Sequence, residues 1–314
     1  MNLPEDQMKL KVVARRELTS DICEFTLQDQ AGGDLPPFSP GAHITVGTPA
    51  GPMRPYSLLN DGTAPERYVI ALKREAESRG GSSSMHQEAQ VGTILQVQPP
   101  KNDFELVDAP RYLLIAGGIG ITPILSMARR LHQDGKPFKL IYCTRSQEET
   151  AFLEECQDFP GAIVHHDNGD LDNFYDFWDH FEEPGREHVY CCGPAPLMEE
   201  IKAISGHWPE GRVHFEDFNA VDSIREDDVA FRVTLARSGR TVEVPADRTI
   251  LEALRDAGEK TVSSCESGTC GTCKCRLVEG EVDHRDLVLM DEEKDDHIMI
   301  CVSRAKKGDL VVDL

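Results

Sequence analysis

The sequence has no long apolar run and no targeting signal at its start. None of its segments approaches the roughly 20 consecutive apolar residues that a membrane-spanning helix requires, so we expect no membrane contact. The first six residues lack the basic and then apolar layout of a secretory signal. Both absences favour a protein that stays in the reducing cytoplasm.

Basic residues are scarce, which leaves the chain strongly acidic. Lysine and arginine total 33 side chains against 55 aspartates and glutamates, for a formal net charge of −22. Such a surface repels phosphate backbones, so we expect no nucleic-acid partner. Two explanations of the acidity stay open: it attracts a basic surface on a partner protein, or it only aids solubility.

Patterns for two kinds of catalytic site are also missing, an oxygen-activating iron site and an acid–base triad. No 2-His-1-carboxylate pattern of an oxygen-activating iron site is evident. The pair His165-His166, followed by Asp167, has no cysteine nearby and is better explained as a strand end than as a metal site. We therefore expect neither oxygen activation nor an acid–base triad in this chain.

The length of 314 residues exceeds what one hydrophobic core usually organises, so we expect two or three domains. Residues 1–108 contain short β segments separated by Gly and Pro turns, a pattern typical of an antiparallel β-barrel. The strands expected there are 9–13, 22–28, 43–46, 67–73 and 94–98.

Residues 109–222 show a different pattern, in which apolar runs alternate with helical stretches at about 122–134 and from 147 onward. This alternation predicts an α/β domain with a parallel sheet covered on both faces. The expected strands are 112–116, 138–143, 163–166 and 188–192.

The last part of the chain begins after a charged segment. Residues 223–229 lack apolar periodicity, and we interpret them as a linker. Residues 230–314 form a third expected domain, which opens with a hairpin pattern around Ser238-Gly239. A short helix is expected at 249–257, closed by Gly258.

Ten cysteines are present, and four of the last five stand in a metal-ligand pattern, Cys-x4-Cys-x2-Cys with a fourth cysteine 27 residues further on. This spacing matches plant-type [2Fe-2S] ligation. Gly268 and Gly271 let the loop backbone adopt positive φ and approach the cluster. A zinc site is the alternative, although zinc more often uses two separated Cys-x2-Cys pairs. The expected ligands are Cys265, Cys270, Cys273 and Cys301.

The segment Arg54-Pro55-Tyr56-Ser57 resembles the Arg-x-Tyr-Ser signature of the ferredoxin-reductase flavin-binding barrel. An arginine can neutralise a phosphate, and a tyrosine ring can lie against the isoalloxazine face. Ser57 is a catalytic candidate, because its hydroxyl can hydrogen-bond near flavin N5, where hydride arrives.

A glycine-rich turn at 79–85 leads into a helix, whose free amides would suit the terminal phosphate of a flavin. A flexible Gly/Ser loop is the alternative. A phosphate site in this place resembles the phthalate dioxygenase reductase family, which binds FMN rather than FAD. The expected flavin contacts are Arg54, Pro55, Tyr56, Ser57, Lys73, Arg79, Gly80, Gly81, Ser82 and Ser83.

A second glycine-rich segment, 117–123, follows a buried strand and opens a helix. Its glycines permit a pyrophosphate to approach the backbone, and the helix N-terminus supplies positive potential. The segment is similar to the Gly-Gly-x-Gly-x-Thr-Pro sequence of ferredoxin-reductase nucleotide domains. The expected contacts are Gly117, Gly118, Gly120, Thr122 and Pro123.

In that family the turn Cys192-Gly193-Pro194 lies under the nicotinamide with its cysteine near the transferring carbon. Cys192 is thus a second catalytic candidate, with a buried apolar role as the alternative. Thr144 and Arg145 end another strand of this domain and are expected to contact the nucleotide. Arg145 could hold a 2′-phosphate, but the glutamates that follow oppose it, and the resemblance favours NADH over NADPH.

Glu216-Asp217-Phe218 is similar to the point where the family places an aromatic ring against the flavin. Phe218 is therefore the third catalytic candidate, as the ring that nicotinamide must displace. The alternative is an ordinary core phenylalanine at a domain seam.

Flavin barrel, nucleotide domain and ferredoxin domain follow one another as in the phthalate dioxygenase reductase family, which the chain resembles over nearly its whole length. The resemblance implies a β-grasp fold for the last domain, and NADH, FMN and a [2Fe-2S] cluster as cofactors. It also implies that the protein passes electrons to the terminal component of a Rieske-type oxygenase, and we expect a monomer. Two alternatives stay open: a different acceptor such as a cytochrome P450, and a non-catalytic redox carrier or sensor.

Overall fold

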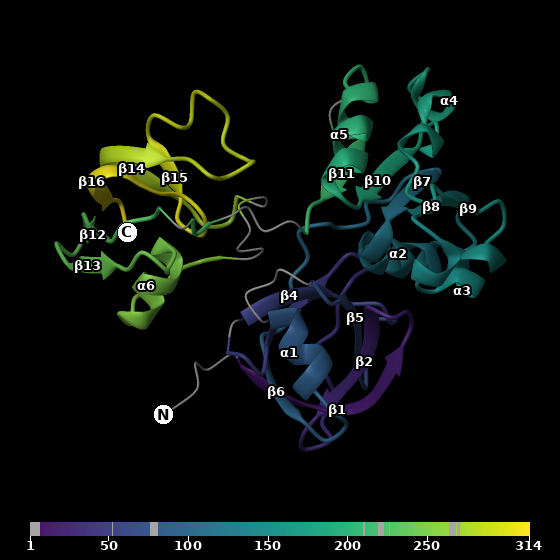
Figure 1. The fold of residues 1–314 in the computed structure, drawn as a ribbon, viewed down its shortest axis with the longest axis horizontal. Coiled ribbons are helices and arrows are strands. Elements are labelled where there is room, and N and C mark those ends of the chain that lie inside the picture. The colour runs from purple at the N-terminus through teal and green to yellow at the C-terminus, as the bar shows by residue number, and fades with distance from the viewer. Residues whose placement is uncertain are drawn as a thin grey trace. The chain divides into compact units, whose positions relative to one another are not determined.

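The structure, a computed structural model, describes residues 7–51, 53–75, 81–209, 211–218, 223–225, 227–263, 268 and 271–314. The chain divides into two compact units, Met1–Glu216 and Asp217–Leu314. The first unit carries two sheets and the second carries one (Figure 1). Within the described ranges, no helix is both long enough and apolar enough to cross a bilayer. The multidomain fold predicted from the sequence is confirmed.

The first sheet is the expected antiparallel barrel, with strand order β4-β3-β6-β1-β2-β5. A bridge between Leu58 and Ile70 joins the chain just after β4 to β5 at the other end of this order. Alternate residues such as Leu10 and Val12 fill its interior. The elements are β1 (Met8–Glu17), β2 (Ile22–Asp29), β3 (His43–Gly47), β4 (Met53–Ser57), β5 (Tyr68–Lys73), α1 (Gly81–Glu88) and β6 (Ile94–Val97).

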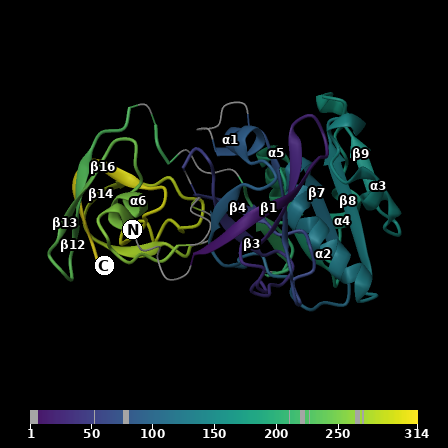
Figure 2. The ribbon, with the colours of Figure 1, turned by 90° about the horizontal axis from the view of Figure 1, so that it is seen from below.

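The second sheet is parallel, with strand order β11-β10-β7-β8-β9. All of β7 is buried, because Leu114 packs on one face with α2 while Ile115 packs on the other with Met198 of α5. Figure 2 shows α2 lying along β7. The strands are β7 (Tyr112–Gly117), β8 (Phe138–Thr144), β9 (Ile163–His166), β10 (His188–Cys192) and β11 (Val213–Glu216). The α-helices are α2 (Ile121–Gln133), α3 (Leu153–Asp158), α4 (Trp178–Phe181) and α5 (Ala195–Ile204), and 3-10 turns η1, η2 and η3 span Gly118–Gly120, Gln147–Glu149 and Leu171–Asn173.

Helix α3 and strand β11 of this α/β part differ from the sequence prediction. The helix expected from 147 onward is a 3-10 turn there, and α3 begins only at Leu153. The Thr150 hydroxyl donates to the Ser146 carbonyl, 2.7 Å away, and Phe152 takes a positive φ of 57°, so the backbone leaves the helical path between the two. Strand β11 was not predicted, because its four residues are only half-buried and carry little apolar pattern.

The third sheet, in the second unit, has the order β13-β12-β16-β14-β15. Strands β12 and β16 pair in parallel and the other neighbours are antiparallel, as in a β-grasp domain. Helix α6 starts with a capping box in which Thr249 and Glu252 satisfy each other's backbone amides. Its Leu251 and Leu254 enter the core beside the sheet. The elements are β12 (Phe231–Leu235), β13 (Thr241–Val244), α6 (Ile250–Asp256), β14 (Lys274–Asp283), β15 (His297–Met299) and β16 (Arg304–Val312).

Candidate functional site

Strand β4 carries the whole Arg-Pro-Tyr-Ser segment at one end of the barrel's strand order, and among the described strands it pairs with β3. Pro55 is exposed, as suits a residue without an amide hydrogen on an edge strand. Ser57 is only 3% exposed, and its buried hydroxyl has no hydrogen-bond partner among the described residues. A buried, unpaired hydroxyl costs free energy. A ligand atom at this place would satisfy it, so the site fits a flavin whose ring nitrogen meets Ser57.

Tyr56 and Arg54 precede this serine. Burial raises the pKa of Tyr56 to about 12, against the opposing charge of Arg54, so the phenol stays neutral. The Arg54 guanidinium donates to the neighbouring Met53 carbonyl at 2.8 Å. Both side chains are half-buried, which leaves part of each accessible to a ligand.

Helix α1 brings the predicted phosphate contacts Gly81, Ser82 and Ser83 into its first turn. The Ser82 hydroxyl accepts a hydrogen bond from the Glu75 amide at 3.1 Å, which ties the helix start to the end of β5. Lys73, the last residue of β5, lies 3.5 Å from an Asp21 carboxylate oxygen. Arg79 and Gly80 lie outside the described residues.

The two nicotinamide motifs meet at the carboxyl ends of β7 and β10, which are neighbours in the parallel sheet. A Cβ atom on Gly117 would lie 2.5 Å from Pro194 Cδ, and one on Gly193 would lie 3.0 Å from the Gly117 backbone. A side chain at either glycine would therefore force the two turns apart. Helix α2 leaves β7 on one face of the sheet and α5 leaves β10 on the other, so the crevice between them is a topological switch point.

Tyr142 on β8 makes a hydrogen bond to the glycine loop after β7, a contact that the sequence motifs do not reveal. Its hydroxyl donates to the carbonyl of Gly118 at 3.1 Å, and Gly118 has a positive φ of 51°. Burial raises the pKa of Tyr142, which keeps this hydroxyl a donor. A lone tyrosine in an apolar strand is the only signal in the sequence.

The predicted threonine contacts form bonds within the protein. Thr122 donates to the Ile119 carbonyl at 3.1 Å, and Pro123 beside it is buried in the first turn of α2. The Thr144 hydroxyl hydrogen-bonds with Thr150 at 2.7 Å and with His166 at 2.8 Å. Arg145, by contrast, is exposed just beyond β8, where a nucleotide could reach it.

The remaining catalytic candidates lie in different units. Cys192 ends β10 in the first unit and is 1% exposed. Phe218 is the second residue of the second unit and is 42% exposed.

The cluster motif is described for two of its four cysteines. Cys273 and Cys301 are 4% and 2% exposed and share one core cluster, while Cys265 and Cys270 lie outside the described residues. Gly271 and Gly268 have φ values of 78° and 80°, as a loop that wraps a cluster needs.

Residues 286–290, here called the strap, support this loop. The Leu287 amide donates to the Gly268 carbonyl at 3.0 Å, and a Cβ atom on Gly268 would lie 2.8 Å from a Val302 methyl group. The buried Asp286 carboxylate accepts from the Leu289 amide at 2.8 Å and fixes the strap. Two buried cysteines beside a supported glycine loop fit the ligand set of a [2Fe-2S] cluster.

Two family profiles match the chain. One is the 2Fe-2S iron-sulfur cluster binding domain, over residues 233–306, and the other is the oxidoreductase NAD-binding domain, over residues 114–167.

Full-length relatives are also similar. The phthalate 4,5-dioxygenase oxygenase reductase subunit of Pseudomonas putida is 51% identical over 97% of this chain and 96% of its own length. The phthalate dioxygenase reductase of Burkholderia cepacia is 48% identical over the whole of both chains. The chain belongs to the phthalate dioxygenase reductase family.

Solved structures agree with this membership. A phthalate dioxygenase reductase, described as a modular structure for electron transfer from pyridine nucleotides to [2Fe-2S], aligns with a TM-score of 0.87 at 48% identity over 98% of each chain. An intact type IV self-sufficient cytochrome P450 monooxygenase aligns with a TM-score of 0.75 at 37% identity, over 98% of this chain and 41% of the other.

Membership in the phthalate dioxygenase reductase family gives the site its chemistry. The protein is an NADH-dependent oxidoreductase, and its cofactors are FMN and a [2Fe-2S] cluster, as predicted. Electrons enter from NADH and reach the cluster through the flavin.

A second feature that the sequence did not reveal is a buried group of ion pairs around Asp228 in the second unit. The Asp228 carboxylate accepts two short hydrogen bonds from Arg285, at 2.6 and 2.8 Å, and lies 3.4 Å from Arg304. Both arginines are almost fully buried, and Arg285 also donates to the Ser223 carbonyl at 2.8 Å. These bonds lower the pKa of Asp228 to about 2. Part of the charged segment 223–229 is thus tied to the rest of the second unit, here called the ferredoxin unit.

Proposed function

We propose that the protein is the reductase component of a Rieske-type oxygenase system, which hydroxylates or demethylates an aromatic or similar small acid. The observation that carries this proposal is full-length similarity to phthalate dioxygenase reductases, which extends across all three sheets. The substrate would be selected by the terminal oxygenase, because this chain's motifs serve only electron transfer. The same relatives support a transient protein partner, and we further propose a cytoplasmic monomer.

In the flavin site, the Ser57 hydroxyl donates a hydrogen bond to the reacting ring nitrogen, and the Tyr56 ring covers one isoalloxazine face. The unpaired state of Ser57 supports this assignment. Arg54 and the first turn of α1 neutralise the phosphate, since a helix N-terminus offers free amides. The further phosphate contacts we assign are Lys73, Arg79, Gly80, Gly81, Ser82 and Ser83, with Pro55 beside the ring.

In the nucleotide site, the glycine loop after β7 binds the pyrophosphate through its backbone, and the Cys192-Gly193-Pro194 turn supports the nicotinamide. The close approach of the two motifs supports these roles. Thr122, Pro123 and Thr144 remain our proposed nucleotide contacts, and the two threonine hydroxyls also bond within the protein. Arg145 contacts the exposed part of the nucleotide, and Phe218 covers the flavin until nicotinamide displaces it.

Bound FMN supplies the conversion between a two-electron hydride donor and a one-electron acceptor. Cys265, Cys270, Cys273 and Cys301 hold that acceptor, the [2Fe-2S] cluster, in the last domain. The domain limits we propose are 1–108, 109–222 and 230–314, with 223–229 as the linker.

A cytochrome P450 acceptor is the second candidate. It is favoured by the self-sufficient P450 monooxygenase that aligns with 98% of this chain, because there a homologous segment shares a polypeptide with a P450. A non-catalytic carrier is disfavoured by the intact glycine loop and by the unpaired Ser57.

The test is an anaerobic absorption experiment with the full-length protein. NADH should bleach both the flavin bands and the broad iron-sulfur absorption, and an oxidised Rieske-type oxygenase component should restore them faster than a cytochrome P450 does. Faster recovery with the P450 would select the second candidate. A preparation whose absorption NADH leaves unchanged, and which fails to reduce cytochrome c, would contradict both.

A further inference from the structure

Arg129 links the flavin barrel to the helix that carries the nicotinamide loop. It lies in α2, which begins directly after the Gly117–Gly120 segment. Its Nη1 donates to the carbonyl of Leu59 at 2.7 Å, across 70 positions of sequence. Leu59 stands two residues beyond Ser57, at the end of the flavin strand β4. One guanidinium therefore joins the segments that we assign to the two reacting partners.

The barrel end of this link is rigid. The Leu59 amide donates to the Val69 carbonyl at 2.9 Å, and its side chain is fully buried in the same core cluster as α2. The Asn60 side chain then donates to the Arg67 carbonyl at 2.9 Å and accepts from the Val69 amide at 2.8 Å. The Leu59 carbonyl is thus held in place by the barrel.

The other end of the link is held by Glu155 of α3. Its two carboxylate oxygens accept from Arg129 Nε at 2.6 Å and from Nη2 at 2.7 Å, a bidentate pair with a defined orientation. The guanidinium also lies 5.8 Å from the centre of the Phe152 ring. Because a planar fork satisfies three acceptors at once, a lysine could not reproduce it.

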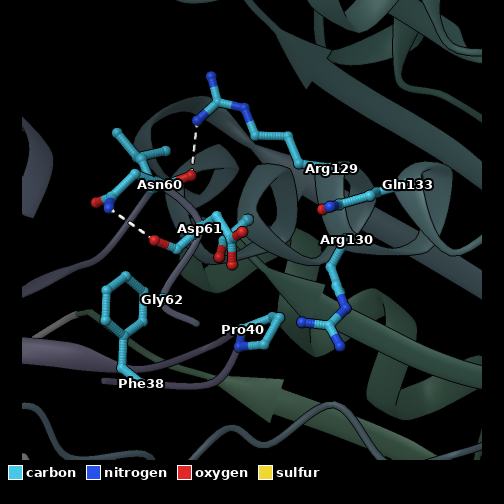
Figure 3. A pocket seen from close by; sticks show the side chains of 10 residues that line it. Phe38, Pro40, Asn60, Asp61, Gly62, Arg129, Arg130 and Gln133 are labelled. Carbon is cyan, nitrogen blue, oxygen red and sulfur yellow. Dashed lines mark hydrogen bonds between the residues drawn. The ribbon is translucent and has the colours of Figure 1, made fainter. Parts of the chain in front are cut away.

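The cavity beside Arg129 is too small to hold a substrate. Residues from the barrel, including Phe38 and Asp61, face Arg130 and Gln133 of α2 across it (Figure 3). Its volume is about 40 Å³, whereas ligand pockets usually measure roughly 300 Å³ or more. The cavity is a small gap in the interface between the barrel and helix α2, within the first unit.

We propose that Arg129 is a positioning residue for hydride transfer. It fixes the position of α2 relative to strand β4. Because the nucleotide loop leads into α2, this position sets the distance between nicotinamide and isoalloxazine. The inference rests on the proposed function of these two sites. A misplacement of about 1 Å can slow a bound reaction by roughly a hundredfold, so the effect should fall on the rate of the step rather than on binding.

The test compares Arg129→Met and Glu155→Gln with Arg130→Met by anaerobic stopped-flow reduction with NADH. Arg130 is the matched control, because it lines the same cavity but pairs at 2.7 Å with Asp134, the residue that caps the end of α2. Arg129→Met should lower the limiting rate of flavin reduction about ten- to a hundredfold, with less than about a threefold change in the dissociation constant of NADH. Glu155→Gln should lie between this variant and the wild type, and Arg130→Met should match the wild type.

Hydrogen exchange of the full-length protein with its cofactors bound gives a second measurement that does not depend on turnover. Amides at 58–62 and in α2 should exchange faster in Arg129→Met than in Arg130→Met. A limiting rate equal to the wild type, even with a lower melting temperature, would overturn the positioning role and leave Arg129 a stabilising residue. If the wild type itself fails to reduce its flavin with NADH, the proposed function fails instead.

Discussion

Gly120 and Cys192 are in such close contact that a Cβ atom on residue 120 would lie 2.3 Å from the Cys192 carbonyl oxygen. The two residues stand 72 positions apart in the sequence and belong to the two motifs assigned to the nicotinamide nucleotide. The backbone conformation does not require glycine here, because φ is −61°, a value that any residue can adopt. Glycine is required because the Cys192 backbone leaves no room for a side chain. The contact therefore couples the pyrophosphate loop to the nicotinamide turn.

Gly120→Ala should weaken NADH binding, because the methyl group must displace the Cys192 turn. We expect the dissociation constant to rise at least about tenfold, or roughly 1.4 kcal/mol. The flavin content should not change, since the proposed flavin contacts on β4 and α1 belong to the barrel and not to the Gly120–Cys192 contact. Titration of the oxidised protein with NADH analogues measures the effect.

The matched control for this substitution is Gly206→Ala. Gly206 lies beyond α5 in the same domain, and its nearest neighbour would be 3.7 Å from a new Cβ atom. Its NADH affinity should equal that of the wild type. If Gly120→Ala binds NADH as tightly as the wild type, the Gly120–Cys192 contact adjusts to the methyl group and does not control nucleotide binding.

Ser57→Ala should separate the function of the hydroxyl from stability. Flavin reduction by NADH is expected to slow about tenfold, or roughly 1.4 kcal/mol of activation free energy, because the ring nitrogen loses a hydrogen bond. The flavin-free protein should be no less stable, since the buried hydroxyl has no partner to lose. Stopped-flow absorbance and thermal unfolding test the two parts, and Ser57→Thr, which keeps the hydroxyl, should retain most of the rate.

Motifs with fixed spacing were sufficient to predict the three-part fold and the cofactors. The glycine loop, the Arg-x-Tyr-Ser segment and the cysteine spacing are local, so each can be recognised from neighbouring residues alone. The fully apolar β7 and the short helix pattern closed by Gly258 also identify their elements from sequence. These are the places where local preference and tertiary packing agree.

Contacts between distant residues were not predictable in this way. Arg129, Tyr142 and Asp228 stand in ordinary surroundings in the sequence, and their partners are 70, 24 and 57 positions away. The charge of 223–229 suggested a linker but gave no sign that Asp228 lies against two buried arginines. A charge pattern does not distinguish a solvated carboxylate from a buried, paired one.

Cys301→Ser should remove the broad iron-sulfur absorption while leaving reduction of the flavin by NADH in place. A thiolate ligand is required of each of the four positions, so reduction of any external one-electron acceptor through the cluster should be lost. Cys275→Ser is the matched control. Cys275 is also buried, and burial raises its pKa to about 12, so it remains a protonated thiol outside the ligand pattern. Loss of the cluster in the control but not in Cys301→Ser would overturn the ligand assignment.

Asp228→Asn should destabilise the ferredoxin unit, because Arg285 and Arg304 would keep their charges without a buried counter-charge. Breaking a buried ion pair at one partner costs about 3 kcal/mol or more. Urea unfolding followed by the cluster absorption measures it. The control is Asp309→Asn, which removes an exposed pair with Arg232 and should cost less than about 1 kcal/mol.

The position at which the ferredoxin unit is cut should show whether 223–229 is only a linker. A fragment of residues 223–314 keeps the Ser223 carbonyl and the Asp228 carboxylate that Arg285 binds, whereas 230–314 loses both. We expect the longer fragment to be more stable by about 3 kcal/mol. Equal unfolding midpoints in urea would show that the linker 223–229 does not stabilise the domain that follows it.

The same carboxylate gives the longer fragment a defined acid sensitivity. The pKa of Asp228 falls from 3.8 to about 2 on folding, chiefly through its hydrogen bonds to Arg285. A lowered folded-state value means that the stabilisation is fully present above the unfolded value of 3.8 and is lost as the pH falls through 2. The stability difference between the wild type and Asp228→Asn should therefore be constant from pH 7 to about pH 5 and shrink below pH 4. Urea unfolding of the cluster-free fragment 223–314 across this range measures it, and a difference that grows on acidification would contradict the ion pair.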